Sequence, residues 1–466
     1  MITQGKQDRG ITRRDFLRLA GLGVGGVALA ACAPKLTEVA TPPTAAVMQP
    51  TTITWQSWGG ADRFTPLIEA WAKTYPDTAK WLTVQAVSGG QQDTEMYQQL
   101  RTALAAGGEG LPDFFEANVD VVPEFATRGL MVDLTDKMQP FVGDLIPGAL
   151  QLASFKDKIV AVPTQVKSKV WYYRKDLFDA AGIDPAKIKS FDNLIEAGNI
   201  YHAKHPDSYI INIGPQPIHY WYGEILTTWD DIRFADENGK WFVTEHPGFA
   251  SLLDWTKKIY DSGIAFKTDD WSSDWQPAVS DGKIGSFLIG SWMTSFIPQF
   301  APAQKGQWGL ALWPEFSREG SEAGGAVVGI SKFSKNVDAA FEFCSEFWLK
   351  PEGSIAWWQA TGLAPMTKSG QSALKELIPN MQKPAEMSDE DWELAPVNYY
   401  GASFMDSIFE TMDHVRIFPY DMSYAAELTI LRQHTEAYLA GTESLQDALA
   451  GAQADMESQI GNPYNI

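Results

Sequence analysis

Residues 282–296 (GKIGSFLIGSWMTSF) contain the side chains whose types and order point most directly to ligand binding. Residues 284–289 form a short apolar run, typical of a strand buried on both faces, and Gly290 leads into a helix predicted to begin at Ser291. A strand that passes into a helix through a small residue places the turn at the carboxyl edge of an α/β sheet, where ligands usually bind. Trp292 would offer a flat apolar face and one N–H there. The alternative is that Trp292 only closes a core.

The other aromatic residues extend this interpretation. The chain has 18 Trp, 15 Tyr and 24 Phe, and many lie in polar segments broken by Gly and Pro rather than on helical stripes. Such segments place rings at a surface, although most aromatic residues of a chain this size belong to its core. Candidate surface rings lie beside Gly59-Gly60, in the run 216–222 and in the acidic stretch 269–275.

Length and composition bound the architecture. A chain of 466 residues is too long for one ordinary core, so two large lobes are expected. Two cysteines cannot build a disulfide framework. The formal net charge of -21 opposes binding to nucleic acid or to an anionic bilayer surface, but it does not identify a ligand.

The first residues predict export and anchoring. Arg13 and Arg14 precede a weakly apolar, Gly-rich run that ends near residue 31, a pattern that matches a twin-arginine signal. Leu29-Ala-Ala-Cys32 resembles a bacterial lipobox, in which cleavage leaves the cysteine as a lipid-bearing N-terminus. We therefore expect a signal peptide over 1–31, a lipid on Cys32 and a flexible Ala/Pro/Thr-rich tether over 32–52. The glycines of 21–26 fit a dinucleotide fingerprint only formally, because no strand precedes them.

Strands and helices alternate through the body of the chain. Strands are predicted to start at Ile53, over 82–87 and within 112–120, with helical spacing between them and polar groups at their ends. This is the doubly wound α/β pattern. A hairpin is expected over 234–243, turning at Asn238-Gly239. Cys344 falls on an apolar helical face and is interpreted as a core thiol.

Several segments carry a family resemblance. Residues 159–178, followed by Ala180-Ala-Gly-Ile-Asp184, resemble the segment by which the chain crosses between lobes in extracellular solute-binding proteins of ABC importers, specifically the sugar-binding branch. Residues 282–292 resemble that family's return crossing, and 324–331 its last crossing strand. Residues 361–365 resemble its GYLPV segment, although Leu363 and Ala364 replace the expected aromatic. Helices over 424–439 and 444–460 match its closing pair.

The resemblance implies a fold and a function. The fold is two doubly wound α/β lobes joined by a multi-strand hinge, with 53–163 plus 286–334 in lobe 1 and 164–285 plus 335–466 in lobe 2. The function is capture of a carbohydrate by hinge closure and its delivery to membrane permease subunits of an ABC importer. The protein would be a monomer, anchored to the membrane outside the cytoplasm by the lipid on Cys32, with no enzymatic activity, no cofactor and no bound metal.

Sugars present C–H faces that stack on rings and hydroxyls that need hydrogen-bond partners. The rings proposed to stack on or face the ligand are Trp58, Tyr220, Trp221, Trp271, Trp275, Trp292 and Trp358. The proposed hydrogen-bonding side chains are Asp62, Glu116, Asn118, Asp120, Gln165 and Lys167. Each polar residue has an alternative role as a cap, a turn residue or a solvated side chain.

Two other functions stay open at this point. An anchored glycosidase would use two carboxylates, such as Glu116 with Asp120 or Glu224 with Asp230. The other alternative is a binding protein for a non-sugar solute or a metal ion, and metal capture could use paired tyrosines, either 172–173 or 399–400. His202 and His205 have helical ligand spacing without a third ligand in view. The zinc-peptidase, serine-hydrolase and nucleotide-loop motifs are absent.

Overall fold

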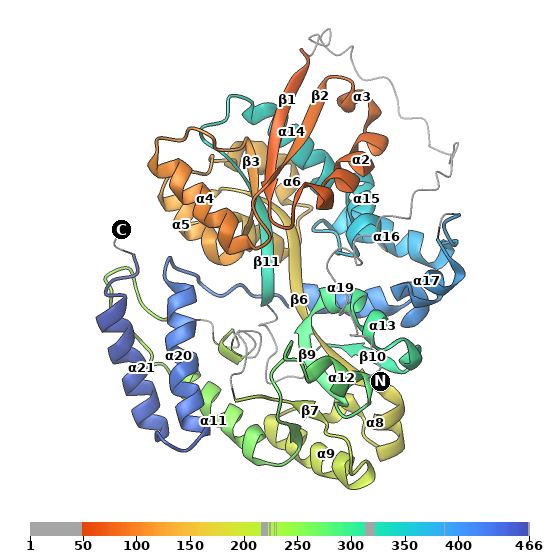
Figure 1. The fold of residues 1–466 in the computed structure, drawn as a ribbon, viewed down its shortest axis with the longest axis vertical. Helices are drawn as coiled ribbons and strands as arrows, with labels where there is room; N and C mark the ends of the chain where they lie inside the picture. The colour runs from red at the N-terminus through yellow and green to blue at the C-terminus, as the bar shows by residue number, and fades with distance from the viewer. Residues whose placement is uncertain are drawn as a thin grey trace, which may run out of the picture.

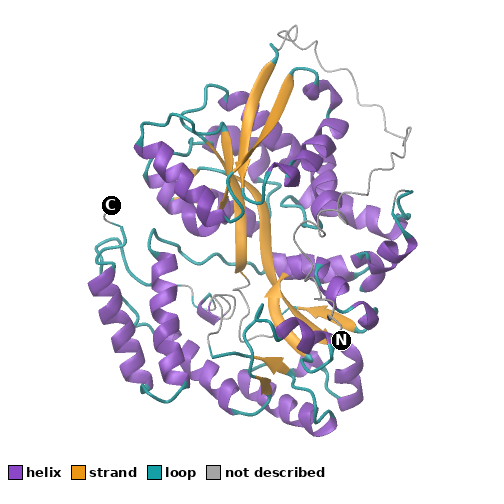
Figure 2. Ribbon diagram, in the orientation of Figure 1, coloured by secondary structure: helices purple, strands orange, loops and turns teal. Residues whose placement is uncertain are grey.

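The computed structural model describes residues 49–215, 222, 225–227, 229, 231–312, 322–385 and 387–464. The chain forms two α/β lobes that lie one above the other in Figure 1, linked by the long strand β6 (Val162–Arg174) and by β11 (Glu322–Ile330). Figure 2 shows helices flanking the strands in both lobes. This arrangement confirms the predicted fold class of two α/β lobes joined by several strands.

The upper lobe is built on β1 (Thr51–Ser57), β2 (Leu82–Ser88) and β3 (Phe114–Asn118). β1 lies between β2 and β3 and is parallel to both, whereas β11 runs antiparallel to β3 and to β6. The alternation of β1 buries Ile53 and Trp55, as the two-residue period of a strand requires. The carboxyl ends of the three parallel strands meet at one edge, which faces the lower lobe in Figure 1.

Helices cover the upper sheet. In α2 (Thr65–Thr74), Leu67 and Trp71 are four residues apart and form its buried stripe. The remaining elements before β6 are η1 (Ala61–Arg63), α3 (Pro76–Ala79), α4 (Asp93–Ala105), η2 (Val119–Val121), α5 (Val122–Thr127), α6 (Thr135–Val142), α7 (Pro147–Ala153), β4 (Ser154–Phe155) and β5 (Lys158–Ile159).

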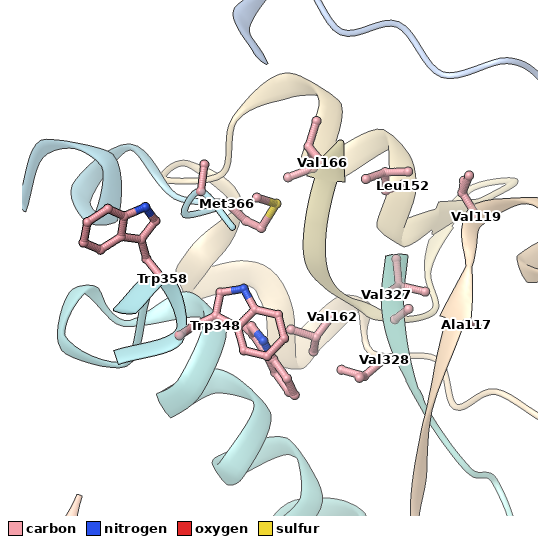
Figure 3. Close-up of a cluster of buried hydrophobic side chains, with 14 of the residues drawn as sticks. Ala117, Val119, Leu152, Val162, Val166, Val327, Val328, Trp348, Trp358 and Met366 are labelled. Atoms are coloured by element: carbon pink, nitrogen blue, oxygen red, sulfur yellow. The ribbon is translucent and has the colours of Figure 1, made fainter. Parts of the chain in front are cut away.

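The helices after β11 pack against the upper sheet, which differs from the lobe division expected from the sequence. Phe343 and Trp348 lie 5.9 and 5.6 Å from Trp55 of β1, measured between ring centroids, and Figure 3 shows Trp348 beside Val162. The first part of residues 335–466, which the sequence analysis placed in lobe 2, therefore packs in the core of the upper lobe. The apolar stripe of this segment shows that one face is buried, but it does not show against which lobe.

Cys344 lies in this upper core, where burial raises the pKa of its thiol, and the predicted core position is confirmed. The elements of this region are α14 (Val337–Cys344), the π-helical turn η7 (Ser345–Leu349), α15 (Pro351–Thr361), α16 (Lys368–Leu377), η8 (Ile378–Asn380), α17 (Asp389–Leu394), α18 (Pro396–Tyr399) and α19 (Phe404–Asp413).

The lower lobe has its own core and a share of β6. The second half of β6 pairs antiparallel with β9 (Ser286–Gly290) and β10 (Trp308–Ala311), and a small parallel pair is formed by β7 (Ile211–Asn212) and β8 (Ala265–Phe266). Its helices and turns are α8 (Lys175–Ala181), η3 (Pro185–Lys187), α9 (Phe191–Lys204), α11 (Pro247–Asp261), α12 (Trp275–Ser280), η4 (Ser291–Ser295), α13 (Ile297–Phe300), η5 (Pro302–Gln304), α20 (Tyr424–Leu439) and α21 (Leu445–Gln459). The hairpin expected over 234–243 is reduced to one antiparallel bridge between Ala235 and Trp241.

The crossings between lobes differ in one place from those expected. β6 crosses downward as predicted, but residues 282–292 do not form the return crossing, because β9 pairs with Lys169–Tyr173 and stays in the lower sheet. The return is made by β11, and the chain crosses again over 414–423 before α20. The local sequence of 282–292 predicts a strand followed by a helical turn whether or not the strand crosses between lobes. It therefore does not distinguish a crossing strand from a strand that stays in the lower lobe.

Candidate functional site

A cavity of about 850 Å³ lies between the two lobes. Side chains from the upper lobe, from β6 and from the lower lobe line it together. Of the residues proposed from the sequence, the cavity brings together Trp58, Asn118, Asp120, Gln165, Lys167, Trp271 and Trp292. Its volume is in the range of small-molecule sites, which are concave and lined mainly by apolar surface with a few polar groups.

Trp58 enters the cavity from the loop after β1. Gly59 and Gly60 both have positive φ, 90° and 82°, and this turn carries the chain from the strand into η1. Arg63, one residue before Phe64, bends back so that its Nη1 donates to the Trp58 carbonyl oxygen at 2.9 Å. The guanidinium carbon lies 5.2 Å from the Trp58 ring centroid, a cation–π distance that fixes the ring.

Glu116 is the centre of a hydrogen-bond network behind this part of the cavity. It is 3% exposed and accepts from the Ser57 hydroxyl and, at 3.2 Å, from the Gln165 amide. Arg63 Nη2 lies 3.8 Å from its carboxylate. Glu116 does not line the cavity but holds Gln165 and Arg63, which do. Together with Trp58 and Asn118, these two residues are called the upper wall below.

The side-chain amide of Asn118 uses its nitrogen in a hydrogen bond within the protein, whereas its oxygen can still accept one. Its Nδ2 donates to Asp93 Oδ2 at 2.9 Å, and its backbone N–H donates to the Tyr97 hydroxyl at 2.8 Å. The carboxylate only accepts, so this bond fixes the orientation of the amide. The Oδ1 atom is buried and has no hydrogen-bond partner among the residues that the structure describes. An acceptor in this position fits a ligand that brings a hydroxyl group.

The lower lobe contributes stacked rings. Trp271 and Trp292 are 5.6 Å apart between centroids with an interplanar angle of 21°, and Phe296 meets both edge-on. Trp271 has a φ of 63° and is 40% exposed, a rare combination for a bulky residue. Strained backbone of this kind persists only where the surroundings hold it, and it clusters at ligand sites. These three residues and Arg432 are called the lower wall below.

A half-buried carboxyl group supports the lower wall. Asp270 precedes Trp271 and accepts from Asn212 Nδ2 at 2.8 Å. Burial, which penalises the charged form, raises the pKa of Asp270 to about 7; the Asp269 carboxylate adds to the rise and the Asn212 hydrogen bond opposes it.

Some proposed residues lie elsewhere. Asp62 is exposed on η1, and Trp275 is fully buried at 5.3 Å from Trp271, so it supports that ring rather than lining the cavity. Trp358 lies in the upper core near Met366 (Figure 3), while its neighbour Trp357 lines the cavity. Tyr220 and Trp221 lie outside the described residues, as do Arg13, Arg14 and Cys32.

The sequence did not single out several lining residues. Four of them neighbour residues that were proposed, either in sequence (Arg63 and Trp357) or in space (Asp93 and Phe296). A second group lies on the segment before α20 and on one face of that helix: Tyr420, Tyr424, Leu428 and Arg432. The last three are spaced four residues apart, and an arginine ending such a stripe was the available signal.

The residues nominated for other chemistry have structural partners. Glu116 is enclosed by Ser57, Gln165 and Arg63, and Glu224 and Asp230 lie outside the described residues. His202 and His205 contact the backbone oxygens of Ser208 and Leu177 at 2.8 and 2.9 Å.

The tyrosine pairs are also enclosed. Tyr172 donates to the Ser291 carbonyl oxygen, Tyr399 donates to that of Ala301, and both hydroxyls are buried. Within the described ranges, no cluster of three His, Cys, Asp or Glu side chains is placed to hold a metal ion. Every helix described is too short or too polar to span a membrane.

Comparison with known proteins identifies relatives. A family model described as bacterial extracellular solute-binding protein matches residues 68–387. The arabinooligosaccharide-binding protein of Bacillus subtilis is 24% identical over 321 residues, which is 65% of this chain and 70% of that protein.

Solved structures share the fold. The sugar-binding protein MalE of Xanthomonas citri has a TM-score of 0.70 at 21% identity, with 88% of this chain and 97% of that chain covered. The ABC transporter associated binding protein of B. animalis subsp. lactis, solved with β-1,6-galactobiose, has a TM-score of 0.64 at 23% identity, with 88% of this chain and 98% of that chain covered.

Proposed function

Because the chain belongs to the bacterial extracellular solute-binding proteins, we propose that it captures a sugar, oligosaccharide or glycoside between its lobes and delivers it to an ABC importer. Relatives named for arabinooligosaccharide and diacetylchitobiose binding support a carbohydrate ligand. They also support a binding protein rather than an enzyme, and we propose that the ligand leaves unchanged.

The observation that carries this proposal is the pairing of ring faces with unsatisfied polar atoms in one cavity. Trp58, Trp271 and Trp292 offer flat apolar surfaces, and Asn118 Oδ1 offers an acceptor without a partner. A sugar ring matches both, since its C–H face stacks on an indole while its hydroxyls complete open hydrogen bonds.

Hinge closure supplies the mechanism. Trp58 and Asn118 belong to the upper lobe and Trp271 and Trp292 to the lower lobe, so a ligand that touches both sets favours the closed arrangement. The lobes are connected by β6, β11 and residues 414–423, where small changes of backbone angles can rotate one lobe against the other. We assign the upper lobe to residues 53–163 plus the β11 to α19 region, and the lower lobe to the rest.

Anchoring completes the proposal. Arg13 and Arg14 direct export by the twin-arginine route, Cys32 receives the lipid, and residues 33–52 tether a monomeric receptor beside the importer's permease subunits in the membrane. A tether of this length keeps the cavity close to the transporter while the lobes open and close freely.

The test is a ligand screen on the purified full chain. A neutral oligosaccharide that binds only the folded protein raises its melting temperature, by an amount that corresponds to about 2.7 kcal/mol at a hundred times Kd. Chromatography of the same sugar after long incubation should recover it intact. Release of shorter products would support the glycosidase, and failure of every sugar while a non-sugar solute binds would overturn the carbohydrate assignment.

A further inference from the structure

Arg432 is a cation on the lower wall that no other charge in the described structure neutralises. It lies on the face of α20 that also carries Tyr424 and Leu428, and all three line the cavity. Its Nε atom is buried without a hydrogen-bond partner, and among the described residues no carboxylate forms an ion pair with it.

Arg63 provides the contrast within the same cavity. Its guanidinium donates to the Trp58 carbonyl oxygen, lies 3.8 Å from Glu116 and stacks on two rings. The charge of Arg63 is therefore used to build the upper wall. Among the residues that the structure describes, none uses the Arg432 guanidinium in this way, which leaves it available for a bound molecule.

The acidic groups around the cavity are already engaged. Asp93 accepts from the Asn118 amide and from the Thr94 backbone N–H, and Asp120 has an interaction of its own. Tyr222 lies within electrostatic range of Arg432, but burial raises the pKa of its phenol, so it stays neutral and adds no negative charge. Glu436, one turn further along α20, is likewise not free.

Closure of the lobes around the Arg432 guanidinium is energetically unfavourable unless the ligand supplies a compensating charge. Expelling water removes solvation from the guanidinium, and a buried charge without a counter-charge is strongly unfavourable. A neutral sugar supplies only hydroxyl oxygens. A carboxylate matches the planar fork of an arginine with two parallel charge-assisted hydrogen bonds.

We propose that Arg432 recognises an anionic group on the ligand, and that the preferred ligand is an acidic oligosaccharide carrying the carboxylate of a uronic acid. This inference rests on the proposed function and narrows its substrate class. A sulfate ester on a sugar presents related chemistry, so the experiment includes both anions.

The experiment compares each acidic sugar with its own neutral form. Uronic acid disaccharides and trisaccharides of several linkages are titrated into the full chain beside their methyl esters, which keep the ring and remove the charge, and beside sulfated neutral disaccharides. We expect at least one acid to bind about tenfold or more tightly than its ester, and its affinity to fall with added salt.

Two variants assign the preference to this side chain. Arg432→Gln should weaken binding of the acid by about 10- to 100-fold and leave the ester almost unchanged, so that the preference disappears. Arg128→Gln removes the same charge from an exposed position on the upper lobe, paired with Glu124, and should alter neither affinity. The melting temperature without ligand confirms that each variant is folded.

The outcomes distinguish failure of the anionic-ligand inference from failure of the proposed sugar capture. If neutral sugars bind and acids bind no better, Arg432 serves a neutral ligand and the inference is wrong while sugar capture stands. If sulfated sugars alone show the preference, the anion is a sulfate and the uronic acid assignment is wrong. If no sugar of any charge binds, the proposed function itself fails.

Discussion

The two walls of the cavity hold their side chains by different means. The upper wall is fixed by hydrogen bonds around the buried carboxylate of Glu116, which has a hydroxyl, an amide and a guanidinium as partners. The lower wall is fixed by ring stacking, and its half-buried carboxyl, Asp270, has one amide donor and the like charge of Asp269 nearby. Within the described structure, the upper wall is thus built around a compensated charge and offers one open acceptor, Asn118 Oδ1, whereas the lower wall is built around apolar surface and offers one open donor, Arg432 Nε.

This difference suggests that the two walls contribute to binding in different ways. Hydrogen bonds with fixed directions position the upper wall before a ligand arrives, which lowers the ordering cost of binding. The lower wall offers area for stacking and a guanidinium that no described carboxylate pairs with, so it gains most from the ligand itself. Breaking each wall should therefore give a different signature, in stability for the upper wall and in affinity for the lower wall.

The largest effect is expected at Glu116. Glu116→Ala strands the Arg63 charge and two hydrogen-bonding groups, and should lower the free energy of unfolding by about 3 kcal/mol, measured by urea denaturation. Glu116→Gln keeps the shape and some of the hydrogen bonds, so its cost should be clearly smaller. A loss below about 1 kcal/mol for Glu116→Ala would show that the network contributes no more than a surface pair.

The next effect concerns Trp292 and ligand affinity. Trp292→Ala removes half of the stacked pair and should weaken sugar binding by about 30-fold, a value typical of a central aromatic contact. Calorimetry or tryptophan fluorescence measures it.

Trp358 supplies the matched control for that change. Trp358→Phe alters a core ring near Met366, so it should lower the melting temperature of the free protein and leave affinity unchanged. Unchanged affinity in Trp292→Ala would place this ring in the core and move the proposed site.

The sequence predicted the elements better than their lobe membership. Strands starting near Ile53 and Leu82 and helices over 424–439 and 444–460 follow from apolar periodicity, and β1, β2, α20 and α21 lie there. The placement of 335–361 could not be predicted in the same way, because a stripe of apolar residues records burial and not the partner. The prediction that residues 282–292 make the return crossing was wrong for a related reason. β9 and β11 are both short apolar strands, so the sequence does not show which of them passes between the lobes.

The candidate site shows the same limit at the level of single residues. Trp357 and Trp358 are adjacent in sequence, and on a helix adjacent side chains point about 100° apart, so choosing between them needs the orientation of α15. Arg432 was missed because nothing local marks an arginine on a helix as unpaired. That property depends on which carboxylates fail to reach it in three dimensions.

A smaller effect follows from Asp270 and pH. The folded-state pKa of about 7 is above the ordinary value of 3.8, so between these pH values the folded protein holds a proton that the unfolded chain has lost. Stability should therefore fall as pH rises from about 4 to about 7. Because Asp270 keeps some solvent access, we expect about 1–2 kcal/mol.

Asp270→Asn tests this contribution while keeping an acceptor for Asn212. The variant should be more stable than the native chain near pH 7 and should show a flatter pH dependence of the urea midpoint. An equal slope in both proteins would assign the pH dependence to other groups.

The smallest effect separates the backbone of Trp271 from its ring. At a φ of 63° a residue with a Cβ is strained and glycine is not. Trp271→Ala and Trp271→Gly both remove the stacking surface, so they should lose sugar affinity equally, whereas Trp271→Gly should be more stable by about 1 kcal/mol. Equal stabilities would mean that this loop relaxes once the ring is gone. In that case stacking on Trp292 is what imposes the left-handed backbone, and the lower wall is held by its rings alone.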